Sequence, residues 1–164
     1  TQASSLYEDT FSLKTSDLIA SNDLILFSNN KNEFYSLDAN KGSLNWKQKI
    51  NSNLRPTSIG NLIFTVSMEG FLILVDKRNG DVIRSTDIFK KFSSKKRKKI
   101  QPIGFIVGLD KVYLTTSNGR LLVIDIMSGQ TTSIFKIDDK KISRPFVLNQ
   151  NLFIIEKNSI IKLD

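Results

Sequence analysis

The chain has 164 residues, of which 40% are hydrophobic and 24% are charged, and its net charge is +8. It contains neither Cys nor His, which excludes disulfides, thiolate nucleophiles, Ser-His-Asp triads and zinc sites that need Cys or His ligands. The composition is that of an ordinary folded domain, and the sequence has no run of 18 apolar residues that could span a membrane.

The first repeating unit, expected over residues 16–50, consists of short apolar runs separated by polar turns. The runs lie at 24–27, 34–37 and 44–50. Such runs, rich in Ile, Val, Phe and Leu and bounded by Gly, Asn and Ser, are typical of β-hairpins. Between the last two runs stands DANKG, from Asp38 to Gly42. Because Gly adopts positive φ easily and an Asp side chain accepts hydrogen bonds from turn amides, we expect a tight turn there.

The second unit, expected over residues 55–89, repeats this order after a leading segment that contains Pro, RPTSIG at 55–60. Its Asp76 and Gly80 keep the offset of four residues, and its apolar runs lie at 62–66, 71–75 and 82–88. A short strand in the leading segment would give the unit four strands.

A basic segment, KKFSSKKRKK at 90–99, follows the second unit and is interpreted as an inserted loop. It contains no anion and seven cations, which are Lys90, Lys91, Lys95, Lys96, Arg97, Lys98 and Lys99. Three interpretations stay open: a solvated loop whose like charges resist packing, a contact for anionic lipid or an acidic protein, and nucleic-acid binding. The segment has a single aromatic residue, Phe92, which argues against stacking on nucleic-acid bases.

The third and fourth units are expected over residues 101–137 and 143–164, and each begins with a segment that contains Pro. The fourth ends at Asp164, before any Gly turn or outer strand. Residues 6–13 resemble an outer strand in position and pattern. They would either complete the last unit or belong to a unit that precedes this chain, and the pattern favours the second alternative.

The repeat itself predicts the fold. The Asp residues at 38, 76, 125 and 164 recur at spacings of 38, 49 and 39 residues, and no window of 11 or more residues has an apolar pattern of helical period. A period of about 40 residues with four short strands is typical of a propeller blade. We therefore expect an all-β fold: a single, partial β-propeller of four-stranded antiparallel blades, with about four blades present.

The strand and turn LDANKGSLNW resembles the repeat of the quinoprotein-like (PQQ-repeat) β-propellers, in which a strand ending in Leu-Asp is followed by a Gly and then a Trp. Within that group, residues 16–164 are most similar to the family of the outer-membrane assembly lipoprotein BamB. Arg84 and Ser133 replace the Trp in the later units. The resemblance implies seven or eight blades, so we expect this chain to be the C-terminal portion of a longer precursor that carries the signal and the lipid anchor.

The resemblance also implies a function: a non-enzymatic scaffold of β-barrel protein assembly, periplasmic and outer-membrane associated, which docks on the periplasmic domains of the barrel-forming subunit. In that family a Leu-x-Leu-Arg loop contacts this partner. The matching SNLRPT at 52–57 carries the contact over to Leu54 and Arg55, although Ser52 replaces the motif's first Leu. The family's second contact, a pair of Asp residues, has no counterpart in KKIQP at 98–102.

Two other functions stay open. One is a PQQ-dependent dehydrogenase, for which the shared repeat implies a calcium ion, an Asp base and a vicinal Cys pair. This chain has no Cys, and adjacent carboxylates such as Asp138 and Asp139 point to opposite faces of a strand. We therefore expect no enzymatic activity, no catalytic residue, no cofactor and no metal site.

The other function that stays open is a module that binds polyanions or lipid surfaces through the basic segment, without nucleic acid as a partner. The open ends of a partial propeller also predict self-association.

Overall fold

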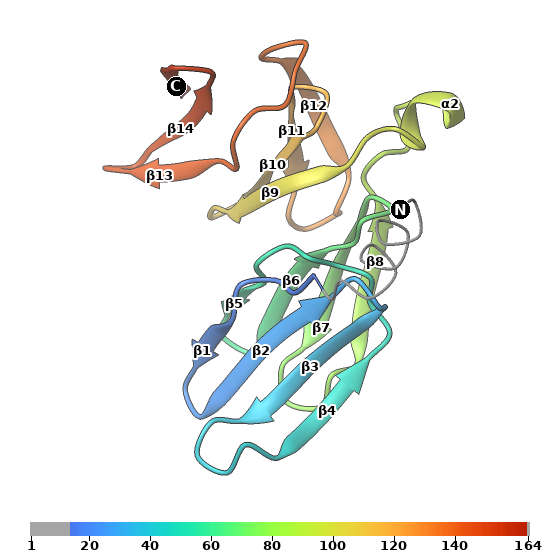
Figure 1. Ribbon diagram of the computed structural model, residues 1–164, viewed down its shortest axis with the longest axis vertical. Helices are drawn as coiled ribbons and strands as arrows, with labels where there is room; N and C mark the ends of the chain where they lie inside the picture. Colours follow the sequence, from blue (N-terminus) through green and yellow to red (C-terminus); the bar gives the residue numbers. More distant parts are fainter. Residues whose placement is uncertain (1–13, 164) are drawn as a thin grey trace, which may run out of the picture.

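Four small antiparallel sheets lie side by side as the blades of a partial β-propeller in the computed structural model, which describes residues 14–163 (Figure 1). Blade 1 contains β1 (Ile19–Ser21), β2 (Leu24–Asn29), β3 (Glu33–Asp38) and β4 (Leu44–Gln48). Blade 2 contains β5 (Thr57–Ile59), β6 (Leu62–Val66), β7 (Phe71–Asp76) and β8 (Val82–Asp87). The expected all-β propeller fold is confirmed.

The remaining elements continue the same order. Blade 3 contains β9 (Pro102–Val107), β10 (Lys111–Thr116), β11 (Arg120–Asp125) and β12 (Thr131–Lys136). Blade 4 has three strands, β13 (Phe146–Leu148), β14 (Asn151–Glu156) and β15 (Ser159–Leu163). Within every blade the strands are neighbours in sequence order. The short helix α2 (Ser94–Arg97) interrupts the basic segment, where the sequence predicted only a loop. The outer strand expected over residues 6–13 lies outside the described residues.

The Asp-to-Gly turns between the third and fourth strands form as the sequence predicts. In blade 1, Asp38 Oδ1 accepts hydrogen bonds from the amides of Asn40 and Lys41 at 2.9 and 2.8 Å, and the amide of Gly42 donates to Asp38 O at 2.8 Å. The φ of Gly42 is +67°, a conformation that costs Gly little. Each turn is followed by a β-bulge in the pairing with the outer strand, which twists the edge of the blade.

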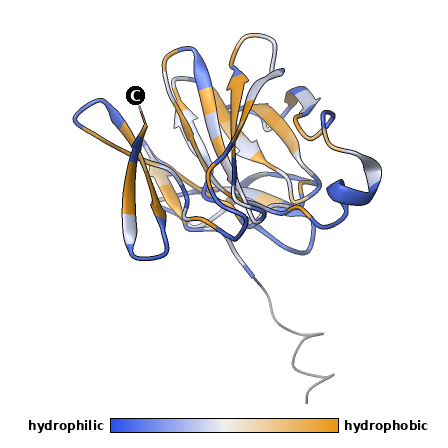
Figure 2. Cartoon of the chain, turned by 90° about the horizontal axis from the view of Figure 1, so that it is seen from above, coloured by the Kyte–Doolittle hydropathy of each residue, from blue (hydrophilic) through white to orange (hydrophobic). Residues whose placement is uncertain are grey.

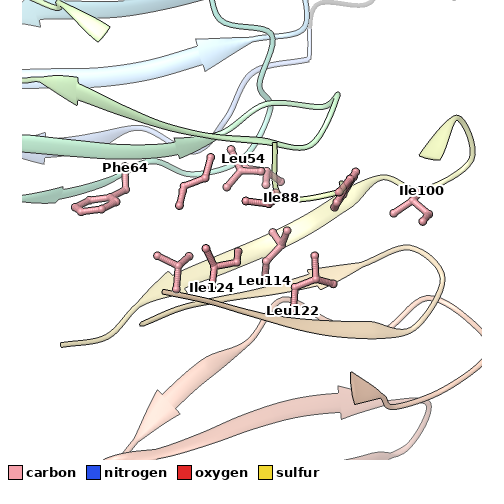
Figure 3. Close-up of a cluster of buried hydrophobic side chains, with 11 residues drawn as sticks. Leu54, Phe64, Ile88, Ile100, Leu114, Leu122 and Ile124 are labelled. Carbon is pink, nitrogen blue, oxygen red and sulfur yellow. The ribbon is translucent and has the colours of Figure 1, made fainter. Parts of the chain in front are cut away.

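The blades are held together by apolar side chains that meet between neighbouring sheets. Between blades 2 and 3, the buried cluster drawn in Figure 3 combines strand residues with residues from the connections, and its labelled members are Leu54, Phe64, Ile88, Ile100, Leu114, Leu122 and Ile124. Equivalent clusters join blades 1 and 2 and blades 3 and 4. In Figure 2 many of the hydrophobic residues lie in the strands, whereas many of the loops are hydrophilic.

Trp46 and Arg84 occupy equivalent places and join successive blades in different ways. The indole of Trp46 stacks on Phe34, with ring centroids 5.7 Å apart, and donates to the carbonyl of Lys77 in the turn of blade 2 at 3.0 Å. The guanidinium of Arg84 donates to the carbonyls of Ile126 and Met127 in the turn of blade 3. The second unit therefore keeps the contact of the Trp with the next turn, although Arg replaces the aromatic ring.

Candidate interaction face

Because successive strands of each blade run in opposite directions, the loops lie on two opposite faces of the propeller. The connection face is made of the segments that link one blade to the next, together with the hairpins between second and third strands. Within the described residues these are 14–18, 30–32, 49–56, 67–70, 88–101, 117–119, 137–145 and 157–158. Connections and hairpins are joined there: the amide of Met68 donates to Asn51 O, and that of Ser117 to Gln101 O, both at 2.8 Å.

The turn face carries the Asp-to-Gly turns and the turns between first and second strands. Its described segments are 22–23, 39–43, 60–61, 77–81, 108–110, 126–130 and 149–150. Between blades 2 and 3 this face has an apolar groove of about 740 Å³, lined by Leu62, Leu74, Arg84 and Met127 among others. The groove lies beside the place where Arg84 stands instead of a Trp.

Arg55 is presented to solvent from the connection that leads into blade 2. The connection is rigid because Ser52, which is fully buried, donates through its hydroxyl to Val66 O at 2.8 Å and accepts from the amide of Leu54 at 3.2 Å. Arg55 itself is exposed and Pro56 behind it is buried. The Ser that departs from the family's motif therefore fixes the loop to strand β6.

Leu54 lies in the core between blades 2 and 3, with 7% of its surface exposed. Its side chain packs in the same cluster as Ile88 and Ile100, at the two ends of the segment that contains α2 (Figure 3). Its role as a partner contact stays a prediction, and from this position Leu54 would act by holding Arg55 in place. Its burial was not foreseen from a sequence that places it directly before Arg-Pro.

The basic segment is attached to the blades through a few of its side chains, whereas most of its cations are exposed. The rings of Phe89 and Phe92 meet edge to face at 5.7 Å, and Phe89 is fully buried. Arg97 forms an ion pair with Asp87 at 2.8 Å, and Lys91 Nζ donates to Thr132 O at 3.0 Å. The other five cations, Lys90, Lys95, Lys96, Lys98 and Lys99, are exposed. No described residue forms an ion pair with them.

A cavity of about 550 Å³ lies between the first strands of the four blades, at the centre of the arc. Arg55 and Arg144 line it together with Asp17, Ser21 and Ser58. Arg144 forms an ion pair with Asp17 at 3.4 Å, which links the connection into blade 4 with the segment before β1. Arg55 and the basic segment thus share one face with Arg144, which the motif alone did not single out.

Within residues 14–163, no group of three or more acidic, His or Cys side chains is placed to hold a metal ion. Asp138 and Asp139 do not lie on a strand, as the sequence predicted, but in the connection that follows β12. Both pair with lysines there: Lys157 lies 3.4 Å from Asp138, and Lys136 lies 2.8 Å from Asp139. A hydrogen bond from the backbone amide of Asp139 is the main cause that lowers the pKa of Asp138 below its ordinary value. The side chain of Lys157 lowers this pKa further. None of the helices among the described residues has the length and hydropathy that a membrane-spanning helix needs.

Comparison with known proteins gives one family and several structures of similar fold. A family model described as "Outer membrane protein assembly factor BamB" matches residues 2–86, just over half of the chain. No curated protein matches the sequence. The crystal structure of BamB from Moraxella catarrhalis is similar with a TM-score of 0.71 and 10% identity, over 90% of this chain and 42% of that one.

Two other solved structures extend the comparison. The computationally designed Ika4 protein has a TM-score of 0.72 and 12% identity, over 93% of this chain and 90% of that one. The Cps50 (Swd1) β-propeller domain of Myceliophteria thermophila has a TM-score of 0.67 and 15% identity, over 85% of this chain and 48% of that one. At these identities the likeness concerns the fold. The chain spans less than half the length of the BamB structure.

Proposed function

Because this chain belongs to the family of the outer membrane protein assembly factor BamB, we propose that it is a non-enzymatic scaffold in the assembly of outer-membrane β-barrel proteins. The observation that carries the proposal is the family match together with a propeller fold whose loops lie on two opposite faces. A propeller can serve as a scaffold through these loops without any chemistry of its own. The proposed location is periplasmic, at the outer membrane.

The proposed partner is the periplasmic part of the barrel-forming subunit, and the proposed contact is Arg55. Three features support this contact: Arg55 is exposed, the connection that carries it is fixed by Ser52, and no described residue pairs with its guanidinium. Arg is among the residues most often found at energetic centres of protein interfaces. Leu54 contributes by filling the core beneath this connection.

The experiment is a titration of this chain against the periplasmic domains of the barrel-forming subunit, with Arg55→Glu beside the wild type. The matched control is Lys41→Glu, which changes the charge equally at an exposed position of the turn face. Saturable binding that Arg55→Glu weakens by about tenfold or more, and that Lys41→Glu leaves unchanged, would support the contact. Equal binding by all three folded proteins would overturn the contact at Arg55, and no binding at all would overturn the partner.

A second proposal concerns the exposed face of blade 4, at one end of the arc. Ile154 is fully buried against blade 3, so its neighbours Phe153 and Ile155 point to the other face of blade 4. No other described blade covers that face, and Ile155 and its cross-strand partner Ile160 are 43% and 67% exposed. We propose that this face mediates self-association of the chain.

A further inference from the structure

The charge of the molecule is segregated between the two faces. Within residues 14–163, the loops of the connection face contain fifteen cations and four anions, a net charge of +11. The loops of the turn face contain three cations and three anions, and the strands contain six of each. All the net positive charge of the described chain therefore lies in the loops of one face. Such an asymmetry produces a positive potential on that side, which attracts anionic surfaces.

The few anions of the connection face are already engaged. Asp17 pairs with Arg144, Asp138 with Lys157 and Asp139 with Lys136, while Glu69 accepts a hydrogen bond from Asn51 at 2.6 Å. Apart from Lys91, whose ammonium donates to Thr132 O, eleven exposed cations of this face have no ion pair with any described residue; they are Lys14, Lys31, Lys49, Arg55, Lys90, Lys95, Lys96, Lys98, Lys99, Lys140 and Lys141. Their charge is available to an external partner.

We propose that the connection face binds the surface of an anionic phospholipid bilayer, with the five free lysines of the basic segment as its principal contact. A cluster of four to eight basic residues is the density at which polybasic segments bind anionic lipid. Because α2 buries none of its residues and the segment is anchored through Phe89 and the Arg97–Asp87 ion pair, the lysines are held on the outside of the propeller. Figure 2 shows this hydrophilic helix standing out from the blades.

The residue types favour lipid over the other polyanions. Ten of the eleven free cations are Lys, whose compact ammonium suits phosphate groups without a fixed geometry. Lys is depleted at specific protein–protein interfaces, where aromatic residues and Arg dominate. In the basic segment, Phe92 packs on Phe89 and partly on the core, so it does not offer a ring on which bases could stack. A diffuse lysine surface therefore fits phospholipid headgroups better than an acidic protein or a nucleic acid.

The test measures co-sedimentation of the chain with vesicles of phosphatidylglycerol and phosphatidylcholine mixed in equal parts, and with vesicles of pure phosphatidylcholine. We expect binding to the mixed vesicles alone, and a steep loss of affinity as the salt concentration rises. The variant Lys95→Gln/Lys96→Gln should weaken binding about 30-fold, at about fivefold for each lysine. The control Lys41→Gln/Lys111→Gln removes the same charge from the turn face and its edge, and should leave binding unchanged.

Binding to pure phosphatidylcholine vesicles, or equal weakening by both double variants, would overturn the proposal. So would failure of a folded wild-type chain to bind the mixed vesicles at low salt. A single-stranded DNA oligomer that displaces the chain from vesicles at equal phosphate concentration would show that nucleic acid is preferred, which also contradicts it. Because the lipid assay contains no protein partner and Arg55 is unchanged in these variants, its result is independent of the docking proposed above.

Discussion

At the scale of single residues, the contrast between Trp46 and Arg84 predicts unequal contributions to stability. Trp46 is 8% exposed and fills the space between blades 1 and 2, whereas Arg84 is half-buried and joins blades 2 and 3 through hydrogen bonds to the carbonyls of Ile126 and Met127. We expect Trp46→Ala to lower the free energy of unfolding by about 3–5 kcal/mol and Arg84→Ala by about 1–2 kcal/mol. Urea denaturation measures both, and equal losses would contradict this account.

A second prediction at this scale concerns Glu33. The hydrogen bond from Lys47, 2.6 Å from the Glu33 carboxylate, and the side chain of Asn29 lower the pKa of Glu33 from 4.5 to about 2. Because the pKa is lower in the folded state, the charged carboxylate stabilises the fold above about pH 4.5, and this stabilisation is lost as the pH falls towards 2. The melting temperature of the wild type should therefore exceed that of Glu33→Gln at neutral pH, and the difference should shrink in acid. A difference that does not change with pH would refute the role of this ion pair.

At the scale of the structural element, the Asp-to-Gly turn allows a comparison between two glycines at the same position of the repeat. An added Cβ at Gly42 would meet nothing within 4 Å, whereas at Gly80 it would lie 2.6 Å from Cδ2 of Trp46. Both residues have positive φ, +67° and +81°, so each Ala variant carries a strain of about 1–2 kcal/mol. We expect Gly42→Ala to cost only this strain and Gly80→Ala at least twice as much, because Trp46 must move. Chemical denaturation of the two variants gives the comparison, and a Gly80→Ala protein as stable as Gly42→Ala would contradict it.

Most elements of each blade could be predicted because a strand and its turn are local. The Asp side chain, the positive φ of the Gly and the apolar alternation all act within a few residues, so DANKG and its repeats already specify the hairpins. Helix α2 could not be predicted, because four residues are fewer than the window in which a helical period can be recognised. The burial of Leu54 was missed for a different reason: it depends on Ile88 and Ile100, which lie far along the chain.

At the scale of the whole molecule, the segregation of charge depends on topology. The sequence shows seven cations in the basic segment and a net charge of +8, which leaves +1 for the rest and suggests that the remaining surface is neutral. Once alternate strand ends are assigned to opposite faces, cations such as Lys31, Lys140 and Arg144 fall on the same side as the basic segment. The predicted hairpins already imply which strand ends lie on the same face, so the segregation of charge could have been predicted from the sequence. The ion pairs formed by the anions could not, because they depend on the three-dimensional structure.

The open ends of the arc give the last prediction, which concerns association of whole chains. The outer face of blade 4 presents Ile155 and Ile160 to solvent, and on blade 1 the stacked rings of Phe27 and Tyr35 lie opposite the buried Leu26. These apolar faces resemble the faces that pack against each other between neighbouring blades, so they should bind a second copy of the chain. We therefore expect the sedimentation coefficient to rise with protein concentration. Ile155→Lys/Ile160→Lys should keep the chain monomeric, whereas Leu109→Lys, at a fully exposed position of the turn face, should not. Because burial of apolar surface is not screened by salt, association should persist at salt concentrations that abolish vesicle binding. A wild-type chain that stays monomeric at every protein concentration measured would contradict the proposed self-association.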